Sequence, residues 1–232
     1  MTRVFDRIVV AVPDLQAAVA QYQQWLDIPP FVSDPLGEEP VARWGLPNTV
    51  IELVQCTVDR PTLQGIVFNV PEAEPVECSV DNPLEIDVRR GNGRSTADFR
   101  RLHPQAQSTA FSVDHVVLRT VDAQSCIDLF AGDLGVRLAL DKTVPEWGGR
   151  MLFFRAGKLT LEVIESDTDK SAGNYFWGLA YQCQDLTVIV KQLSERDVAV
   201  SDIREGRKPG TRVATLKSHC LEIPTLLIQP AT

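Results

Sequence analysis

Short runs of β-type residues recur four times along the chain, at 6–12, 64–70, 114–120 and 177–183. Seven positions after the second residue of each run stands an acid, in turn Asp14, Glu72, Asp122 and Asp185. After three of these acids, apolar residues return at the spacing of one helix face. An aspartate suits the start of a helix, because its carboxylate accepts hydrogen bonds from the free N–H groups of the first turn. The pattern predicts a repeated strand-helix unit.

The third copy continues with three further strand-like runs, at 136–140, 150–155 and 159–164, and 156–158 supplies the turn between the last two. The first copy ends in a similar run at 49–55, and the fourth in runs at 212–217 and 225–229. Each of these copies therefore predicts a β-α-β-β-β module. The second copy is too short for a helix and two more strands, so we interpret it as an abbreviated module.

We predict an α+β fold in which repeated β-α-β-β-β modules form cup-shaped, mostly antiparallel curved sheets in two linked halves. A polar, turn-rich stretch at 89–96 is typical of a connection between such halves. We assign residues 1–108 to an N-terminal half, which includes the abbreviated module, and residues 109–232 to a C-terminal half.

Composition narrows the range of partners. The chain is 44% hydrophobic and 23% charged, and its net charge of -8 disfavours nucleic acid and anionic membrane surfaces. No apolar run approaches the roughly 20 residues that span a bilayer, and the N-terminal residues lack a leader pattern. The five cysteines are widely spaced without a C-x-x-C pair, which favours reduced thiols. We therefore expect a cytoplasmic protein without membrane or nucleic-acid partners.

Two segments of the third copy, 113–118 and 159–164, resemble the opening and closing strands of the vicinal-oxygen-chelate superfamily, of glyoxalase, bleomycin-resistance and extradiol dioxygenase type. Segments 5–8 and 50–53 resemble the same strands in the first copy. The resemblance implies a divalent ion (Fe, Mn, Ni or Zn) held in a cup, where adjacent substrate oxygens chelate it. The positions that match its ligands are His115 and Glu162, and Glu162 is also the expected catalytic carboxylate.

The other modules lack this pair. The fourth has Gly178 and Leu226 at the equivalent positions, and the second has Gly65 with Glu85 as the candidate carboxylate. The first has Arg7 and Glu52. A guanidinium does not ligate a metal, so we expect a metal-free N-terminal cup in which Arg7 pairs with Glu52 or grips an anionic ligand.

Four further residues are candidates for binding the substrate. Arg119 and Gln182 lie four residues beyond the His-equivalent position of their copies, so strand alternation aims them into the same cavity. Trp177 is a candidate for a pocket wall. Arg207 belongs to a basic stretch at 203–212, which forms either a clamp for a carboxylate or phosphate or a solvated hairpin.

We therefore predict a metal-dependent vicinal-oxygen-chelate enzyme, of lyase/isomerase or dioxygenase type, that acts on a small oxygen-rich substrate. Isomerase chemistry is favoured, because the oxygenases that resemble this fold usually carry two His and one Glu. The alternative is a metal-free protein that binds and sequesters a small molecule, as bleomycin-resistance proteins do; a scaffold with closed cups is a third. The oligomeric state is left open, a homodimer included.

Overall fold

The computed structural model describes residues 4–33, 40–70, 77–91, 99, 110–144, 149–165 and 173–231. The expected boundary between the halves, near residue 108, lies outside these residues. We retain the division at that point as a proposal.

The first sheet contains seven strands in the order β2-β3-β4-β1-β5-β7-β6. Their bounds are β1 (Val4–Val12), β2 (Phe31–Ser33), β3 (Val41–Gly45), β4 (Val50–Gln55), β5 (Thr62–Asn69), β6 (Cys78–Ser79) and β7 (Asp87–Gly91). At its centre β1 and β5, the opening strands of the first two modules, are antiparallel. Each opening strand is paired in parallel on its other side, β1 with β4 and β5 with β7.

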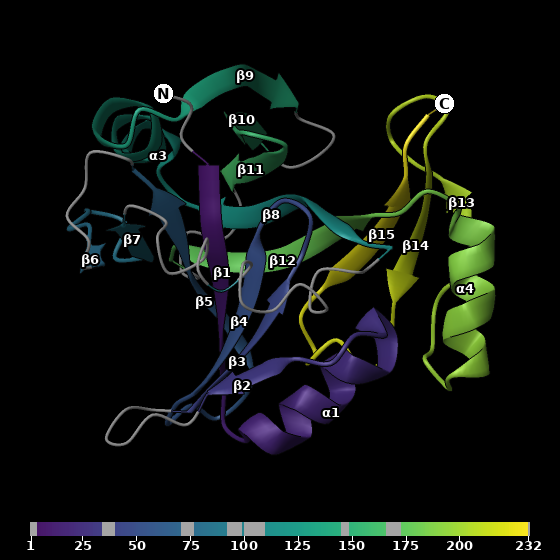
Figure 1. Ribbon diagram of the computed structural model, residues 1–232. Coiled ribbons are helices and arrows are strands. Elements are labelled where there is room, and N and C mark those ends of the chain that lie inside the picture. The colour runs from purple at the N-terminus through teal and green to yellow at the C-terminus, as the bar shows by residue number, and fades with distance from the viewer. Residues whose placement is uncertain are drawn as a thin grey trace.

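The second sheet contains eight strands in the order β13-β14-β15-β12-β8-β11-β10-β9. Their bounds are β8 (Ser112–Thr120), β9 (Arg137–Val144), β10 (Gly149–Ala156), β11 (Leu159–Glu165), β12 (Tyr175–Gln182), β13 (Arg204–Glu205), β14 (Arg212–Leu216) and β15 (Thr225–Gln229). The plan of the first sheet is repeated: β8 and β12 are antiparallel, with β11 parallel to β8 and β15 parallel to β12. The predicted α+β fold of repeated modules with curved mixed sheets is confirmed (Figure 1).

The helices begin at the aspartates that the sequence indicated. Helix α1 (Leu15–Leu26), α3 (Ala123–Ile127) and α4 (Leu186–Glu195) are capped by the side chains of Asp14, Asp122 and Asp185. Helix α3 continues into a π-helical segment, η2 (Asp128–Asp133), which the periodicity did not reveal. None of the described helices has the length and hydropathy that crossing a bilayer requires.

One hydrophobic core joins the two halves. It is built from the helix-facing side of each sheet and from buried rings of α1 and η2. Trp25 of α1 packs against Tyr181 of β12 with ring centroids 4.9 Å apart, and Phe68 of β5 lies 6.1 Å from Phe130 of η2. In Figure 1 the strands of the first sheet run across those of the second, with α1 and α4 at the outside. The side of each sheet that faces away from this core, and that carries Arg7 or His115, is called the cup face below.

Two glycines occupy the position that corresponds to His115 in the second and fourth modules. A Cβ at Gly178 would lie 2.6 Å from the carbonyl oxygen of Pro224, and one at Gly65 would lie 2.5 Å from that of Asp87. Side-chain atoms do not approach a carbonyl oxygen so closely. In both modules the neighbouring backbone therefore leaves no room for a histidine side chain at this position.

Replacing Gly178 by alanine is expected to destabilise the protein by about 1–3 kcal/mol, because the added methyl group must displace a packed backbone. The measurement is the free energy of unfolding from urea denaturation. Gly132→Ala is the matched control, since a Cβ there meets no described atom within 4 Å. Equal stabilities of the two variants would contradict the close packing at Gly178.

Candidate functional site

The cup face of the second sheet carries three side chains of β8 that alternate toward it, His115, Val117 and Arg119. The parallel pairing with β11 sets a partner beside each one: Thr160 beside His115, Glu162 beside Val117 and Ile164 beside Arg119. The two predicted metal ligands thus lie on neighbouring strands and on the same face, because Glu162 stands beside the residue two positions after His115.

The structure brings His115 and Glu162 together. The Nε2 atom of His115 lies 3.5 Å from Oε2 of Glu162. On the other side of the imidazole, Nδ1 lies 2.8 Å from Oδ2 of Asp114. Because a carboxylate oxygen accepts, Nδ1 donates to Asp114, which leaves Nε2 facing Glu162. In the neutral ring Nε2 is an acceptor, and in the protonated ring it is a donor. Two acceptors that face each other are stable when a cation, either a proton on the ring or a metal ion, lies between them.

Asp114 was not a candidate from the sequence, and the reason is geometric. Neighbouring residues of a regular strand point to opposite faces. Here β8 has a bulge: His115 pairs with Ala180 and Val113 with Tyr181, so Asp114 has no partner on β12. Such an extra residue re-aims side chains, and it places Asp114 beside the ring that follows it. An acid directly before a ligand-type histidine was the only available signal.

The cluster is accessible and electrostatically polarised. The side chains of His115 and Glu162 are 18% and 14% exposed. The hydrogen bond from His115 is the main reason that the pKa of Asp114 is lowered, and the charges of Lys208 and Arg155 contribute. Lys208 lies in the loop between β13 and β14, so this loop reaches the edge of the cup.

An apolar floor adjoins the polar cluster. It consists of Val117, Val144, Met151 and Ile164, with Phe153 packed against them. Phe153 stands between Glu162 and Leu140 in the sheet. Leu140 is 49% exposed at the rim. The cup therefore offers a hydrophobic surface beside its carboxylate.

Arg119 and Trp177 meet at one end of the cup. The guanidinium carbon of Arg119 lies 5.3 Å from the centroid of the indole ring, a cation–π distance. A register shift between Phe176 and Gly178 leaves Trp177 outside the regular pairing, and its side chain is 41% exposed. The structure thus joins two of the predicted substrate-binding residues to each other.

The remaining two candidates lie elsewhere. Gln182 pairs with Ser112 and Ile228 at the opposite end of β12 from Trp177, and it shares the cup face with Ala180. Arg207 is exposed in the β13–β14 loop. In this loop, Lys208 is the residue whose charge acts on Asp114. His115 and Glu162 form the centre, Arg119 and Trp177 lie toward one end of β8 and β12, and Gln182 lies toward the other.

The N-terminal cup holds an ion-pair network at the corresponding place. Arg7 donates from Nε to Oε1 of Glu52 at 3.1 Å and from Nη1 to Asp6 at 3.0 Å. Arg43 binds the second oxygen of Glu52 at 2.6 Å. The predicted pairing of Arg7 with Glu52 inside the cup is confirmed. Asp6 lies in a strand bulge, as Asp114 does in β8.

This network extends into the second module, where one expectation was wrong. In the first module Glu52 pairs with Val9, two residues after Arg7. In the second module Val67, two residues after Gly65, pairs with Arg89, so Arg89 is the residue equivalent to Glu52. Glu85 instead lies in a turn before β7, with a positive φ of 55°. Arg89 pairs with Asp87 at 2.5 Å and with Glu77, which also contacts Arg7. The apolar run that contains Glu85 is a turn, because the strand begins two residues later.

The N-terminal network is more enclosed than the C-terminal cluster. The side chains of Arg7 and Glu52 are 10% and 5% exposed. Burial opposes the charge of Arg7, but the carboxylates of Glu52, Glu77 and Asp6 outweigh it and raise its pKa. Burial also disfavours ionised Glu52, but Arg7 and Arg43 reverse the balance and lower its pKa. Phe99 covers this cup face together with Phe31 and Val50.

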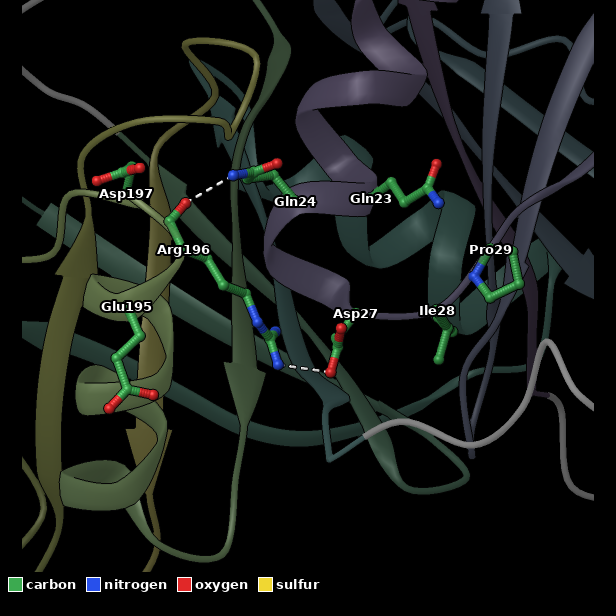
Figure 2. Close-up of a pocket in the computed structure, with 8 residues that line it drawn as sticks. All are labelled: Gln23, Gln24, Asp27, Ile28, Pro29, Glu195, Arg196 and Asp197. Carbon is green, nitrogen blue, oxygen red and sulfur yellow. Dashed lines mark hydrogen bonds and ion pairs between the residues drawn. The ribbon is translucent and has the colours of Figure 1, made fainter.

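A separate cleft of about 420 Å³ lies where the C-terminal ends of α1 and α4 meet (Figure 2). Arg196 spans it, with an ion pair to Asp27 at 2.5 Å, and its carbonyl oxygen accepts from Gln24 at 2.6 Å. The lining residues are Gln23, Gln24, Asp27, Ile28, Pro29, Glu195, Arg196 and Asp197. None of them belongs to either cup. We assign the cleft to the contact between the halves and not to the candidate site.

Residues 114–215 match the Glyoxalase/Bleomycin resistance protein/Dioxygenase superfamily. No curated protein matches the chain by sequence. This match confirms the resemblance for the C-terminal half. The matched segment includes both His115 and Glu162.

Solved structures of similar fold cover the whole chain. A triple mutant of 4-hydroxymandelate synthase from Streptomyces coelicolor aligns with 99% of this chain and 93% of its own, at a TM-score of 0.71 and 13% identity. A fusion of a xylose isomerase-like TIM barrel with 4-hydroxyphenylpyruvate dioxygenase aligns with 99% of this chain and 49% of its own, at 0.65 and 13%. Methylmalonyl-CoA epimerase from Mycobacterium tuberculosis aligns with 52% and 88%, at 0.43 and 19%. At these identities the likeness concerns the fold alone.

Replacing Arg7 by methionine is expected to destabilise the protein by about 3–5 kcal/mol, because three carboxylates lose their shared buried partner. Urea denaturation at neutral pH measures this. Arg150→Met is the control, since Arg150 pairs with Asp141 near the surface, where such pairs contribute about 0–1 kcal/mol. The folded pKa of Glu52 is lowered, so its contribution is present above about pH 4.3 and is lost as the pH falls through the folded value. A loss no larger than that of Arg150→Met would refute the buried network.

Replacing Asp114 by alanine is expected to change the tautomer of His115. With Asp114 present, Nδ1 holds the proton of the neutral ring; without it, the Nε2–H form becomes the major one because Glu162 then accepts that proton. Nitrogen chemical shifts of the imidazole ring report the change directly. His219, which contacts Ser218 in a distant loop, serves as the internal control. An unchanged His115 spectrum would show that Asp114 does not set the tautomer.

Proposed function

We propose that the C-terminal cup is the active site of a metal-assisted enzyme of the vicinal-oxygen-chelate type that acts on a small oxygen-rich substrate. In this proposal His115 and Glu162 are the protein ligands of a divalent ion. The observation that carries it is the approach of Nε2 of His115 and Oε2 of Glu162 to 3.5 Å on an accessible cup face.

The two donors fit such an ion. Imidazole nitrogen and carboxylate oxygen bind zinc at about 2.0–2.2 Å, so two such atoms 3.5 Å apart would both be within reach of one ion. Asp114 supplies the outer hydrogen bond that orients a metal-binding histidine and fixes its tautomer. Imidazole with carboxylate suits iron, manganese, nickel or zinc.

The ligand set is small. In the described part of the chain, no group of three His, Cys, Asp or Glu residues is placed to hold an ion. Catalytic zinc sites usually have three protein ligands. We therefore expect weak binding of the ion by the protein alone. Two adjacent oxygens of the substrate would complete the coordination, so that substrate and ion bind together.

Each residue has a distinct role in this proposal. A bound ion supplies Lewis-acid stabilisation of negative charge that develops on the substrate oxygens. Glu162 would hold the ion with one carboxylate oxygen and would take a proton from the carbon next to the substrate carbonyl with the other. Returning that proton to the neighbouring carbon would complete an isomerisation. The apolar floor limits access of water to the transferred proton.

The donor set favours isomerase chemistry over oxygenation. Oxygenases that resemble this fold usually present two His and one Glu. Here Gly178 occupies the place of the second histidine, and Leu226 stands at the position equivalent to Glu162.

The alternative is a metal-free protein that binds and sequesters a small molecule. The apolar floor and the exposed ring of Trp177 favour it, because such surfaces bind flat hydrophobic ligands. In that case, His115 and Glu162 form a hydrogen-bonded pair through a proton on the ring.

Manganese binding separates the two functions. Protein without a polyhistidine tag is stripped with a chelator and titrated with Mn²⁺, and free ion is followed by electron paramagnetic resonance. His115→Ala and Glu162→Gln are each expected to weaken binding by about 10-fold or more. His219→Ala, which removes a histidine outside the cup, is expected to have no effect. Equal Mn²⁺ binding by all four proteins would exclude the proposed ion site. A thermal shift with hydrophobic compounds but not with Mn²⁺ would support the binding protein.

A further inference from the structure

Arg119 differs from the other half-buried arginines in lacking a carboxylate partner. Arg7, Arg43, Arg89, Arg150 and Arg196 each form an ion pair with an Asp or Glu. Within the described residues, Arg119 makes no ion pair, and its Nε is buried without a hydrogen-bond partner. Stacking on Trp177 holds the guanidinium in place without neutralising its charge.

The surroundings of Arg119 on the cup face explain this lack of a partner. Ile164 is its neighbour on β11 and Tyr175 is its neighbour on β12. On the next strand, β10, Met151 is the neighbour of Ile164, and on β9 at the edge of the sheet Lys142 is the neighbour of Met151. This row across the sheet contains two cations and no carboxylate among the residues that the structure describes. An anion that enters the cup would find a complementary charge here.

The position of Arg119 relative to the His115–Glu162 pair sets the size of such an anion. Arg119 lies four residues beyond His115 on the same strand, so their Cα atoms are about 13 Å apart. Val117 lies between them on the same face. A ligand that touches both ends must place its anionic group several bonds from the oxygens held at His115 and Glu162, with an apolar stretch above Val117.

We infer that the substrate of the C-terminal cup carries a carboxylate separated by a short carbon chain from its chelating oxygens, and that Arg119, oriented by Trp177, binds this carboxylate. The inference rests on the proposed function, because it takes the His115–Glu162 pair as the place where the oxygens bind. A guanidinium is planar and presents parallel N–H groups that match a carboxylate, so the recognition is directional. Its role is specificity: acids without the second carboxylate bind less well.

Two five-carbon acids test this. The probes are 2-oxoglutarate and 2-oxovalerate, which share the α-oxo acid group and differ in that only the former has a second carboxylate. Affinities are measured by calorimetry in the presence of Mn²⁺. The wild-type protein is expected to prefer 2-oxoglutarate by roughly 10-fold or more, the effect of a hydrogen bond between charged groups.

Substitutions test whether Arg119 causes the preference for 2-oxoglutarate. Arg119→Gln is expected to remove the preference while leaving the affinity for 2-oxovalerate within about 2-fold of the wild type. Arg119→Lys keeps the charge without the planar guanidinium group and is expected to retain part of the preference for 2-oxoglutarate. Arg150→Gln, which removes an arginine on the opposite face of the sheet, is expected to retain it fully. Circular dichroism confirms that each variant is folded.

The outcomes distinguish this inference from the function on which it rests. Equal wild-type affinity for the two acids, or a preference that survives in Arg119→Gln, overturns the assignment of Arg119. If both acids still lose affinity in His115→Ala, the proposed site remains intact. Binding of both acids that is unaffected by His115→Ala, or no binding of either acid, counts instead against the proposed function.

Discussion

The parallel pairing of the opening and closing strands of a module determines what each cup contains. Because strand side chains alternate, this register brings residue 7 or 115 of the opening strand onto the same face as residue 52 or 162 of the closing strand. A slip of one residue would turn these side chains into the apolar core. The apolar positions on the other face prevent that slip, since they must remain buried. The packing of the core therefore determines which side chains face the cups.

The same register produces two different sites. In the first module the opening strand presents a guanidinium, which neutralises Glu52 and needs nothing from solution. In the third it presents an imidazole whose outer nitrogen is already bound by Asp114, so the inner nitrogen faces Glu162. The first arrangement contains a guanidinium and is enclosed. The second has an imidazole in its place and is more accessible. The residue at this position of the opening strand is thus one of the differences between an enclosed ion-pair network and an accessible candidate site.

Much of this arrangement is local enough to be predicted from the sequence. The aspartate caps and the alternating strands follow from spacing, because the modules repeat. The pairing of Arg7 with Glu52 followed from the resemblance of segments 5–8 and 50–53 to the opening and closing strands of the superfamily. The bulge at Asp114 did not follow, since strand alternation assigns that carboxylate to the opposite face. Arg89 was missed because the short second module offers too few residues to fix its register. The stacking of Arg119 on Trp177 depends on a second register shift, in β12. Bulges arise from the pairing of distant strands, which a single sequence leaves undetermined.

The fourth module explains why the substrate matters so much to this cup. Gly178 faces the carbonyl oxygen of Pro224 at a distance that leaves no room for a Cβ, so a histidine there would require the backbone to move. Leu226 adds an apolar side chain where the third module has Glu162. This half of the cup therefore contributes shape and hydrophobic surface in place of ligands. In the proposed function, the remaining coordination would come from the substrate. A substrate with two adjacent oxygens and a distant carboxylate would meet the His115–Glu162 pair with the oxygens and Arg119 with the carboxylate.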